Sequence, residues 1–397
     1  MAVPKIRFPG FTEDWEQRKL GAIATFLNGR AYKQDELLTS GKYKVLRVGN
    51  FYTNDRWYYS DLELADKFYA DKGDLLYTWS ASFGPHIWLG DKVIYHYHIW
   101  KVVLSEYILK DFALQILEKD KQNILSHPNG STMIHVTKVD MENKQICIPC
   151  LAEQQKIGNF FKYLDETITL HQRKLESMKL LKKSLLQKMF PKNGESVPEV
   201  RFPGFTDAWT QSKFGPLVTI ERGGSPRPID RFITDSPNGL NWVKIGDAPK
   251  QGNYITKTAE KIRPEGLSKT REVHPGDLIL SNSMSFGKPY IMAINGCIHD
   301  GWLAIRNYQN SFDLKFLCVL LGTSQMLSQY KAMAAGSTVN NLNKELVGST
   351  MVKFPCLDEQ RKIGRFFESF EDSLSINQRE IDELQKLKTS FSQQMFV

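Results

Sequence analysis

Two pairs of residues have the spacing of metal ligands. Cys147 and Cys150 are separated by two residues, which is the spacing of one half of a zinc site. His96 and His98 are two residues apart in a run that we expect to be one strand, so their side chains would share a face. The sequence offers no second cysteine pair and nominates no further ligand for the histidines. We therefore favour two strand-end cysteines over zinc, and a structural or base-contacting role for the histidines.

One acidic cluster has the composition of a nuclease site. Asp140, Glu142 and Lys144 supply two carboxylates and a lysine, and such carboxylates can hold the metal ions of phosphate hydrolysis. The cluster keeps open the hypothesis that the chain acts alone as a nuclease or methyltransferase. No G-x-G-x-x-G loop opens a helix, and neither a Walker lysine loop nor a G-x-S-x-G elbow occurs. The sequence therefore predicts no catalytic constellation and no metal site.

Basic, aromatic and amide residues interleave in the loops of the first 150 residues. Lys and Arg neutralise phosphates, and Arg, Asn, Ser and Thr can contact base edges in the major groove. For the lysines the alternative is a solvated surface, and for the tryptophans it is core packing. The DNA-binding candidates in this part of the chain are Lys44, Arg47, Asn50, Arg56, Thr78, Trp79, Ser80, Ser82, His86, Ser131 and Thr132.

A second set of similar residues lies between positions 222 and 340. The glycine-rich turns at 222–225 and 129–132 could accept a phosphate through their backbone amides. The candidates in this part of the chain are Arg222, Ser225, Arg227, Lys244, Asn282, Ser283, Ser285, Lys288, Ser337, Thr338 and Asn340.

These two sets lie on two copies of one sequence pattern. The segment 4–15 returns as 198–209, Gly73-Asp74 as Gly276-Asp277, the Gly-Ser-Thr of 130–132 as 336–338, and 149–158 as 355–364. The nuclease-like cluster does not return, because its equivalent, 346–350, contains no acid, and Cys147 corresponds to Lys353. Landmarks in the same order twice indicate two domains of one fold.

Each copy divides into a mixed region and a long helix. Short β-rich runs at 44–48 and 93–100, with one helix near 111–125, predict an α+β domain. Segments 159–190 and 365–397 lack Gly and Pro. We therefore expect domains at 1–150 and 191–356, and long helices at 151–190 and 357–397.

The two helices carry the apolar repeat of a coiled coil. The apolar seam positions alternate in steps of four and three. Two seam positions are polar in both copies, and polar seam residues restrict register. The seam residues are Ile157, Phe161, Leu164, Ile168, Leu175, Met178, Leu185 and Met189, then Ile363, Phe367, Phe370, Leu374, Ile381, Leu384, Phe391 and Met395; the polar ones are His171 and Lys182, then Asn377 and Lys388.

Charge favours pairing between the helices. The first carries eight basic and four acidic residues, and the second carries six and eight. Opposite net charges attract, whereas self-pairing of the first helix would be repulsive. The alternative is a separate bundle helix within each domain.

Composition sets the class of protein. The chain has 397 residues and a net charge of +8, which permits a polyanionic partner without establishing one. Divided at the expected boundaries, the net charge is +1, +4, +5 and −2 in chain order, so the second domain should bind DNA with the stronger salt dependence. No run of about 18 apolar residues occurs, five cysteines form no disulfide framework, and the start lacks a secretory core. We expect a cytoplasmic protein.

The duplicated motifs resemble the specificity subunit of type I restriction–modification systems. The pattern Pro-x-Leu-x-Glu-Gln-x-Lys-Ile opens both helices, at 149–157 and 355–363. The Gly-Asp-Leu segments, the Gly-Ser-Thr loops and the turn at 223–227 also match that family. The first copy departs from it at this turn, where Asn28-Gly29-Arg30-Ala31 replaces Gly-Gly-Ser-Pro-Arg.

The resemblance implies a non-catalytic DNA reader within a larger enzyme. It implies two target-recognition domains at opposite ends of an antiparallel coiled coil, which read a bipartite, asymmetric DNA sequence. It also implies two methyltransferase subunits that use S-adenosylmethionine, and restriction subunits that use ATP and Mg²⁺, while this chain binds no cofactor. An adaptor that binds only proteins through its helices is the remaining alternative.

Overall fold

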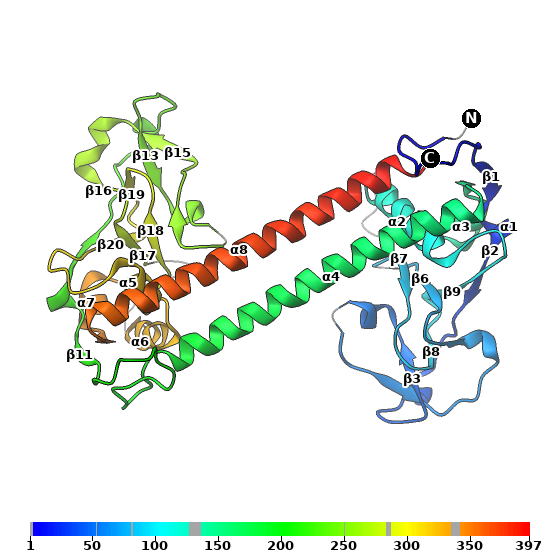
Figure 1. Ribbon diagram of the computed structural model, residues 1–397, viewed down its shortest axis with the longest axis horizontal. Helices are drawn as coiled ribbons and strands as arrows, with labels where there is room; N and C mark the ends of the chain where they lie inside the picture. The colour runs from blue at the N-terminus through cyan, green and yellow to red at the C-terminus, as the bar shows by residue number, and fades with distance from the viewer. Residues whose placement is uncertain are drawn as a thin grey trace. The chain divides into compact units, whose positions relative to one another are not determined.

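The computed structural model describes residues 3–52, 54–80, 82–126, 136–249, 251–282, 287–334 and 342–397. The chain forms two compact units (Figure 1). Unit 1 comprises residues 1–170 and 381–397, and unit 2 comprises residues 171–380. None of the described helices combines the length and the hydropathy that a membrane span requires.

The described residues of unit 1 form three antiparallel or mixed sheets and the helices packed on them. The strand orders are β1-β10, β2-β9-β6-β7 and β4-β3-β8-β5. The elements are β1 (Glu16–Lys19), α1 (Leu20–Ile23), β2 (Ala24–Asn28), β3 (Tyr43–Leu46), β4 (Tyr58–Ser60), β5 (Tyr69–Ala70), β6 (Leu75–Thr78), β7 (Gly84–Ile87), β8 (Val93–Tyr95), β9 (Ile99–Leu104), α2 (Lys110–Ser126), α3 (Lys138–Asn143) and β10 (Gln145–Ile148).

Unit 2 repeats this topology with one additional strand. The orders are β11-β21, β12-β20-β17-β18-β14 and β15-β13-β19-β16, and among the described residues of unit 1 no strand corresponds to β14. The elements are β11 (Thr210–Lys213), β12 (Thr219–Arg222), β13 (Leu240–Val243), β14 (Tyr254–Ile255), β15 (Glu260–Ile262), β16 (Arg271–Val273), β17 (Leu278–Ser281), β18 (Pro289–Met292), β19 (Gly296–Ile298), β20 (Trp302–Arg306), α5 (Leu314–Leu321), α6 (Ser324–Ala334), α7 (Lys344–Ser349) and β21 (Met351–Phe354).

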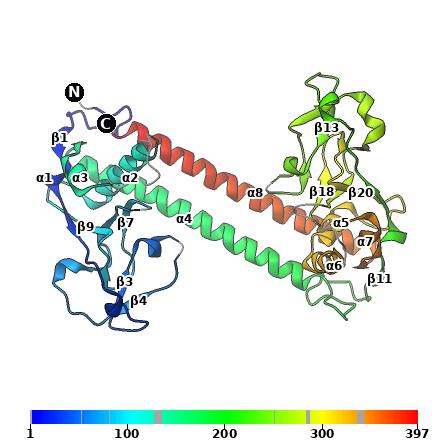
Figure 2. The same ribbon diagram turned by 180° about the vertical axis from the view of Figure 1, so that it is seen from behind.

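The predicted long helices are confirmed as α4 (Leu151–Lys188) and α8 (Leu357–Gln394). Both helices contribute to both units, and Figure 2 shows α5, α6 and α7 beside the part of α8 that belongs to unit 2. In unit 1 the start of α4 lies beside the end of α8, with the rings of Phe160 and Phe391 5.0 Å apart. In unit 2 the end of α4 lies beside the start of α8, with Phe190 6.4 Å from Phe367. The helices are therefore antiparallel and pair with each other.

The polar seam residues bond across the pair. His171 Nδ1 lies 3.1 Å from Asn377 Oδ1, and the Asn377 amide donates to the His171 carbonyl at 3.0 Å. Lys182 pairs with Glu371, and Lys388 pairs with Asp165 at 2.5 Å. In the observed alignment each of these polar groups has a partner on the facing helix, which favours this register.

A repeated Arg–Glu pair attaches the start of each long helix to the N-terminal segment of the domain that precedes it. Arg7 donates two hydrogen bonds to Glu153 at 2.7 and 2.8 Å, and Arg201 donates two to Glu359, both at 2.7 Å. Both glutamates are fully buried. The glutamine of the same motif acts similarly, since the Gln154 amide donates to the carbonyl of Tyr107 at 3.0 Å. The Glu-Gln motif is therefore a structural clamp.

Each unit buries a Met-Phe end of a long helix. Met395 and Phe396 belong to the core of unit 1, and Met189 and Phe190 to the core of unit 2. The ring of Phe396 lies 5.5 Å from Phe112. Each domain core is therefore completed by the end of the helix from the other copy.

One predicted strand is interrupted. The run 93–100 is not continuous, because β8 ends at Tyr95 and β9 begins at Ile99. His96 and His98 lie in the connection between these strands, so the prediction that both lie on one strand is wrong. The two strands belong to different sheets, and only a turn at 96–98 allows the chain to pass from one to the other.

Candidate nucleic-acid interface

In unit 1, aromatic and imidazole side chains gather around the turn at 96–98. The Trp79 indole stacks on Trp100 with ring centroids 5.9 Å apart, and its Nε1 donates to the Tyr97 carbonyl at 2.8 Å. The rings of His96 and His98 are 5.0 Å apart. Burial lowers the pKa of His96 to about 4, so this imidazole is neutral at pH 7. The cluster offers aromatic faces and, at His96, a neutral imidazole.

A second group in unit 1 surrounds His86. Its ring stacks on Phe51 with centroids 4.1 Å apart, and its Nε2 lies 3.3 Å from the Tyr52 hydroxyl. Burial lowers the pKa of His86 to about 4. Ser80 and Ser82 lie between β6 and β7, the strand that carries His86, and are half-buried and exposed respectively. These side chains can exchange hydrogen bonds with a base edge without carrying charge.

Two of the three basic candidates of unit 1 lie over aromatic rings. Arg47 is 4.3 Å from the centre of the Tyr58 ring, and the Lys44 ammonium is 5.3 Å from that of Trp57. Arg56 is exposed. Stacking of this kind orders long side chains while leaving N–H groups for phosphate.

Three predicted contact residues use their side chains to support loops. The Asn50 amide donates to the carbonyls of Asn54 and Arg56 at 2.9 and 3.0 Å. Thr78 is fully buried and donates to the Ser82 carbonyl at 2.8 Å. Asn282 is buried and its amide donates to the Asp300 carbonyl at 2.9 Å. Each therefore holds a loop that presents other side chains.

In unit 2, one carboxylate organises the surface around the 222–227 turn. Asp300 accepts from the Ser225 hydroxyl at 2.9 Å, lies 2.8 Å from His299 Nε2 and 3.9 Å from Arg227. Burial lowers the pKa of His299, although the charge of Asp300 acts in the opposite direction. Arg227 is 77% exposed, so most of its guanidinium is available to a partner. Arg222 is exposed at the end of β12.

The two lysines of unit 2 that the sequence proposed as DNA contacts differ in their surroundings. Lys244 is half-buried and forms an ion pair with Glu260. Lys288 lies 4.9 Å from the centre of the Tyr290 ring.

The sequence suggested that backbone amides of the 222–225 turn could accept a phosphate, but its two glycine amides are not free to do so. The Gly223 and Gly224 N–H groups donate to the carbonyls of Trp302 and Ile298 at 2.9 and 3.2 Å. A Cβ at Gly223 would lie 2.2 Å from the His299 carbonyl oxygen. These glycines are therefore needed for close backbone packing, and their amides are already used.

The residues that suggested metal or nuclease chemistry do not converge. Asp140 accepts from Thr137 at 2.6 Å, Glu142 lies 3.5 Å from Lys138, and Lys144 pairs with Asp120. Within the described ranges, no three His, Cys, Asp or Glu side chains are grouped so as to hold a metal ion. Cys147 and Cys150 are free thiols, one half-buried and one exposed.

Seven candidates lie outside the described residues: Ser131, Thr132, Ser283, Ser285, Ser337, Thr338 and Asn340. The structure adds residues that the sequence did not nominate. Tyr52 and Tyr97 are 45% and 39% exposed beside His86 and Trp79, and Asp300 organises the unit 2 surface. The aromatic run 95–98 was the available signal for Tyr97.

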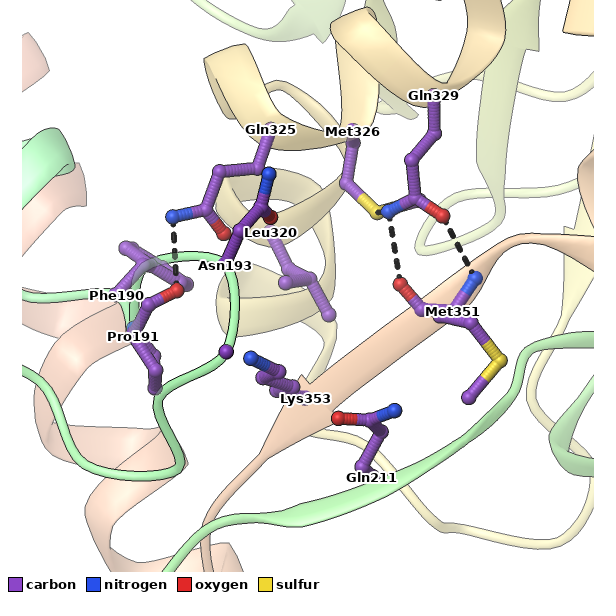
Figure 3. A pocket seen from close by; sticks show the side chains of 11 residues that line it. Phe190, Pro191, Asn193, Gln211, Leu320, Gln325, Met326, Gln329, Met351 and Lys353 are labelled. Carbon is purple, nitrogen blue, oxygen red and sulfur yellow. Dashed lines mark hydrogen bonds between the residues drawn. The ribbon is translucent and has the colours of Figure 1, made fainter.

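A small cavity of about 240 Å³ lies where the chain passes from α4 to β11 (Figure 3). Two of the side-chain amides that line it are hydrogen-bonded: Gln325 donates to the Pro191 carbonyl at 2.8 Å, and Gln329 bonds both backbone groups of Met351 at 2.8 and 2.9 Å. The Gln325 bond attaches the linker to α6, and the Gln329 bonds attach α6 to β21, so these amides have a structural role.

Two copies of one α+β topology, each with its own set of surface side chains and joined by paired helices, define a duplicated recognition protein. Residues 12–180 and 207–386 match the family described as type I restriction modification DNA specificity domain. The chain belongs to this family.

Relatives align over nearly the whole chain. The type I restriction enzyme MjaVIII specificity subunit of Methanocaldococcus jannaschii is 23% identical over 95% of this chain and 90% of its own length. The putative MjaX specificity subunit of the same organism is 21% identical, over 95% and 91%. The S subunit of the type I restriction-modification system from M. genitalium has a similar fold, with a TM-score of 0.64 at 16% identity, over 100% of this chain and 99% of that one. A chain from a structure on complex assembly of the type I R-M system has a TM-score of 0.57 at 18% identity, over 96% and 97%.

Proposed function

We propose that this chain is the DNA sequence-specificity subunit of a type I restriction–modification complex and has no catalytic activity alone. The observation that carries the proposal is the duplicated topology with different side chains at equivalent positions. Trp79 and Asn282 are equivalent in the two copies, as are Tyr97 and Asp300, each one residue after the shared histidine. One scaffold with two sets of side chains suits a target with two unlike halves.

The chemistry of each unit favours a different mode of reading. Unit 1 presents neutral imidazoles and stacked aromatic rings, which suit hydrogen bonds and apolar contacts with base edges. Unit 2 presents Arg227 beside Asp300 and Ser225, which suits a guanidinium contact to guanine that a carboxylate holds in place. Arg222 and Lys244 supply charge for phosphates.

The assembly follows from the same proposal. The complex contains two methyltransferase subunits that use S-adenosylmethionine, together with restriction subunits that use ATP and Mg²⁺, in the cytoplasm. This chain binds none of these cofactors itself. The family membership, and a relative studied for complex assembly of the type I R-M system, support such partners.

The decisive experiment maps methylated adenines across a genome with and without this chain, in cells that contain the partner methyltransferase. We expect one bipartite, asymmetric motif that disappears without the chain. Exchange of residues 191–356 for the equivalent segment of another family member should change one half of the motif only.

A point substitution sharpens this test. Arg227→Ala should weaken DNA binding by about tenfold and relax one position of the motif, because a bidentate base contact is worth about 1–3 kcal/mol. Lys174→Ala on α4 is the matched control, since Lys174 is exposed and lies outside the recognition surfaces. Methylation that does not depend on the chain would refute the proposal, as would a motif with both halves changed by the exchange.

A further inference from the structure

Unit 2 contains a large cavity that the recognition surfaces do not use. Its volume is about 630 Å³, within the range of roughly 300–1,000 Å³ typical of small-molecule sites. The end of α4, the start of α8, α5 and the loop before β14 surround it. Its apolar floor includes Leu186, Ile291, Val319, Leu327 and Phe367.

The floor is only partly covered by protein. Phe367 is 1% exposed and Ile291 4%, whereas Leu186, Val319 and Leu327 are half-buried. Apolar side chains left in contact with water at the bottom of a cavity favour an apolar occupant.

The rim of this cavity is cationic. Five lysines and three carboxylates line it. Lys182 pairs with Glu371, and Lys315 pairs with Glu368 at 2.5 Å. In the described part of the chain, neither Lys179 nor Lys183 has a carboxylate at ion-pair distance, and Lys288 lies over the Tyr290 ring. The uncompensated charge on the rim is therefore positive.

The features that form the cavity are specific to the second copy. The helix that is continuous in α2 is broken at Gly322 between α5 and α6, and Gly322 lines the cavity. The additional strand β14 carries Tyr254, whose hydroxyl donates to Glu368 of α8 at 2.8 Å. Lys182 and Lys388 are equivalent seam positions of the two helices. In the same alignment, Lys179 corresponds to Gln385 and Lys183 to Thr389, so the fold does not require these two charges.

We propose that this lysine-rimmed cavity binds a small amphiphilic organic anion. The apolar body lies against the floor, and a single anionic group, a carboxylate or a phosphate monoester, lies at Lys179, Lys183 and Lys288. A lysine ammonium is a compact cation on a flexible stem, so it can follow an anionic group at the mouth of the cavity. The occupant is independent of DNA, and its binding can be measured on the full chain alone.

Isothermal titration of the purified full chain tests the proposal with four ten-carbon probes below their micelle concentrations. These are decanoate, decyl phosphate, decan-1-ol and decyltrimethylammonium. We expect one equivalent of an anionic probe to bind, decan-1-ol to bind about tenfold more weakly, and the cation not to bind, because a charge-assisted contact is worth about one decade or more in affinity. Comparison of decanoate with decyl phosphate identifies the preferred headgroup.

Two variants locate the site. Lys179→Gln with Lys183→Gln should weaken the anionic probes about tenfold and leave decan-1-ol almost unchanged. Leu327→Trp should fill the cavity and weaken all probes. The matched control, Lys162→Gln with Lys174→Gln, removes two exposed lysines of the same helix that do not line the cavity.

Equal affinity for the anionic, neutral and cationic probes would overturn the proposal. So would an equal loss of affinity for the anionic probes in the Lys179/Lys183 variant and in the Lys162/Lys174 control. Absence of binding by the wild-type chain would do the same. Because the lysines are exposed, their replacement does not threaten folding, so the test stands even if the tryptophan variant misfolds. DNA recognition is measured separately and is unaffected by either outcome.

Discussion

Removal of one partner of the buried Arg201–Glu359 pair should destabilise unit 2 strongly. Glu359 is fully buried and Arg201 is 11% exposed, with both hydrogen bonds at 2.7 Å. Arg201→Met leaves the carboxylate buried without its cation, and such a loss costs about 3–5 kcal/mol. Glu359 lies in the first turn of α8, where the helix dipole partly stabilises a carboxylate, so we expect the lower half of this range.

Urea unfolding followed by circular dichroism and tryptophan fluorescence measures this effect, because urea does not screen charge. With a slope of about 3 kcal/mol per molar, a loss of about 3–4 kcal/mol should lower the midpoint of the unit 2 transition by about 1–1.3 M. Replacing both residues, as Arg201→Met with Glu359→Leu, should recover most of the loss, since an apolar pair of similar volume removes the buried charge altogether.

Arg7 and Glu153 provide an internal comparison. Their geometry is nearly the same, with 13% and 0% exposure, so Arg7→Met should lower the unit 1 transition to a similar extent. A cost below about 1 kcal/mol for Arg201→Met would refute the reasoning, because it is the value of a solvent-exposed ion pair. So would a double variant less stable than the single one.

Three further outcomes are expected. Phe396→Ala should lower the stability of unit 1 by about 3–5 kcal/mol in urea unfolding, because the ring is 5% exposed in an aromatic core; a cost under about 1 kcal/mol would contradict this. Asn377→Ala removes the hydrogen bonds to His171 and should cost unit 2 about 1–3 kcal/mol by the same measurement, with Ser373→Ala, an exposed position on the same helix, as control. The folded pKa of His86, about 4, lies below its ordinary value of 6.5, so the unfolded chain binds the extra proton between these values and stability falls as the pH falls through this window. His86→Phe keeps the stack on Phe51 and should reduce the loss of thermal midpoint between pH 7 and 5; an unchanged loss would exclude His86 as its source.

The sequence predicted those elements that are encoded by patterns among residues near one another in the chain. The duplication, the α+β class, the helix near 111–125 and both long helices follow from repeats and from apolar spacing, and each is present. The interruption at 96–98 could not be read in the same way. A β-rich run looks continuous in sequence, while the change of sheet between Tyr95 and Ile99 depends on which strands pair.

The candidate site was only partly predictable for a related reason. The sequence nominated Trp79, Ser225 and Arg227 by residue type, and the structure places them at the surface or partly so. Residue type did not distinguish them from Thr78 and Asn282, which are of equally suitable chemistry but are buried with internal hydrogen bonds. Exposure and hydrogen-bond partners are properties of the folded chain.

By itself, the sequence determined that this protein contains two copies of one domain. It also determined that the two long helices have opposite net charges and matching apolar repeats, which favour their pairing. Only the tertiary structure decided what the repeated motifs do. Glu153 and Glu359 are buried and bind arginines that lie 146 and 158 residues earlier in the chain. The glycines of the 222–225 turn allow close contact between backbone segments. The physical reason is that periodicity and composition act between neighbours in the chain, whereas an ion pair, a buried amide or a close backbone approach requires a partner that only folding brings within reach.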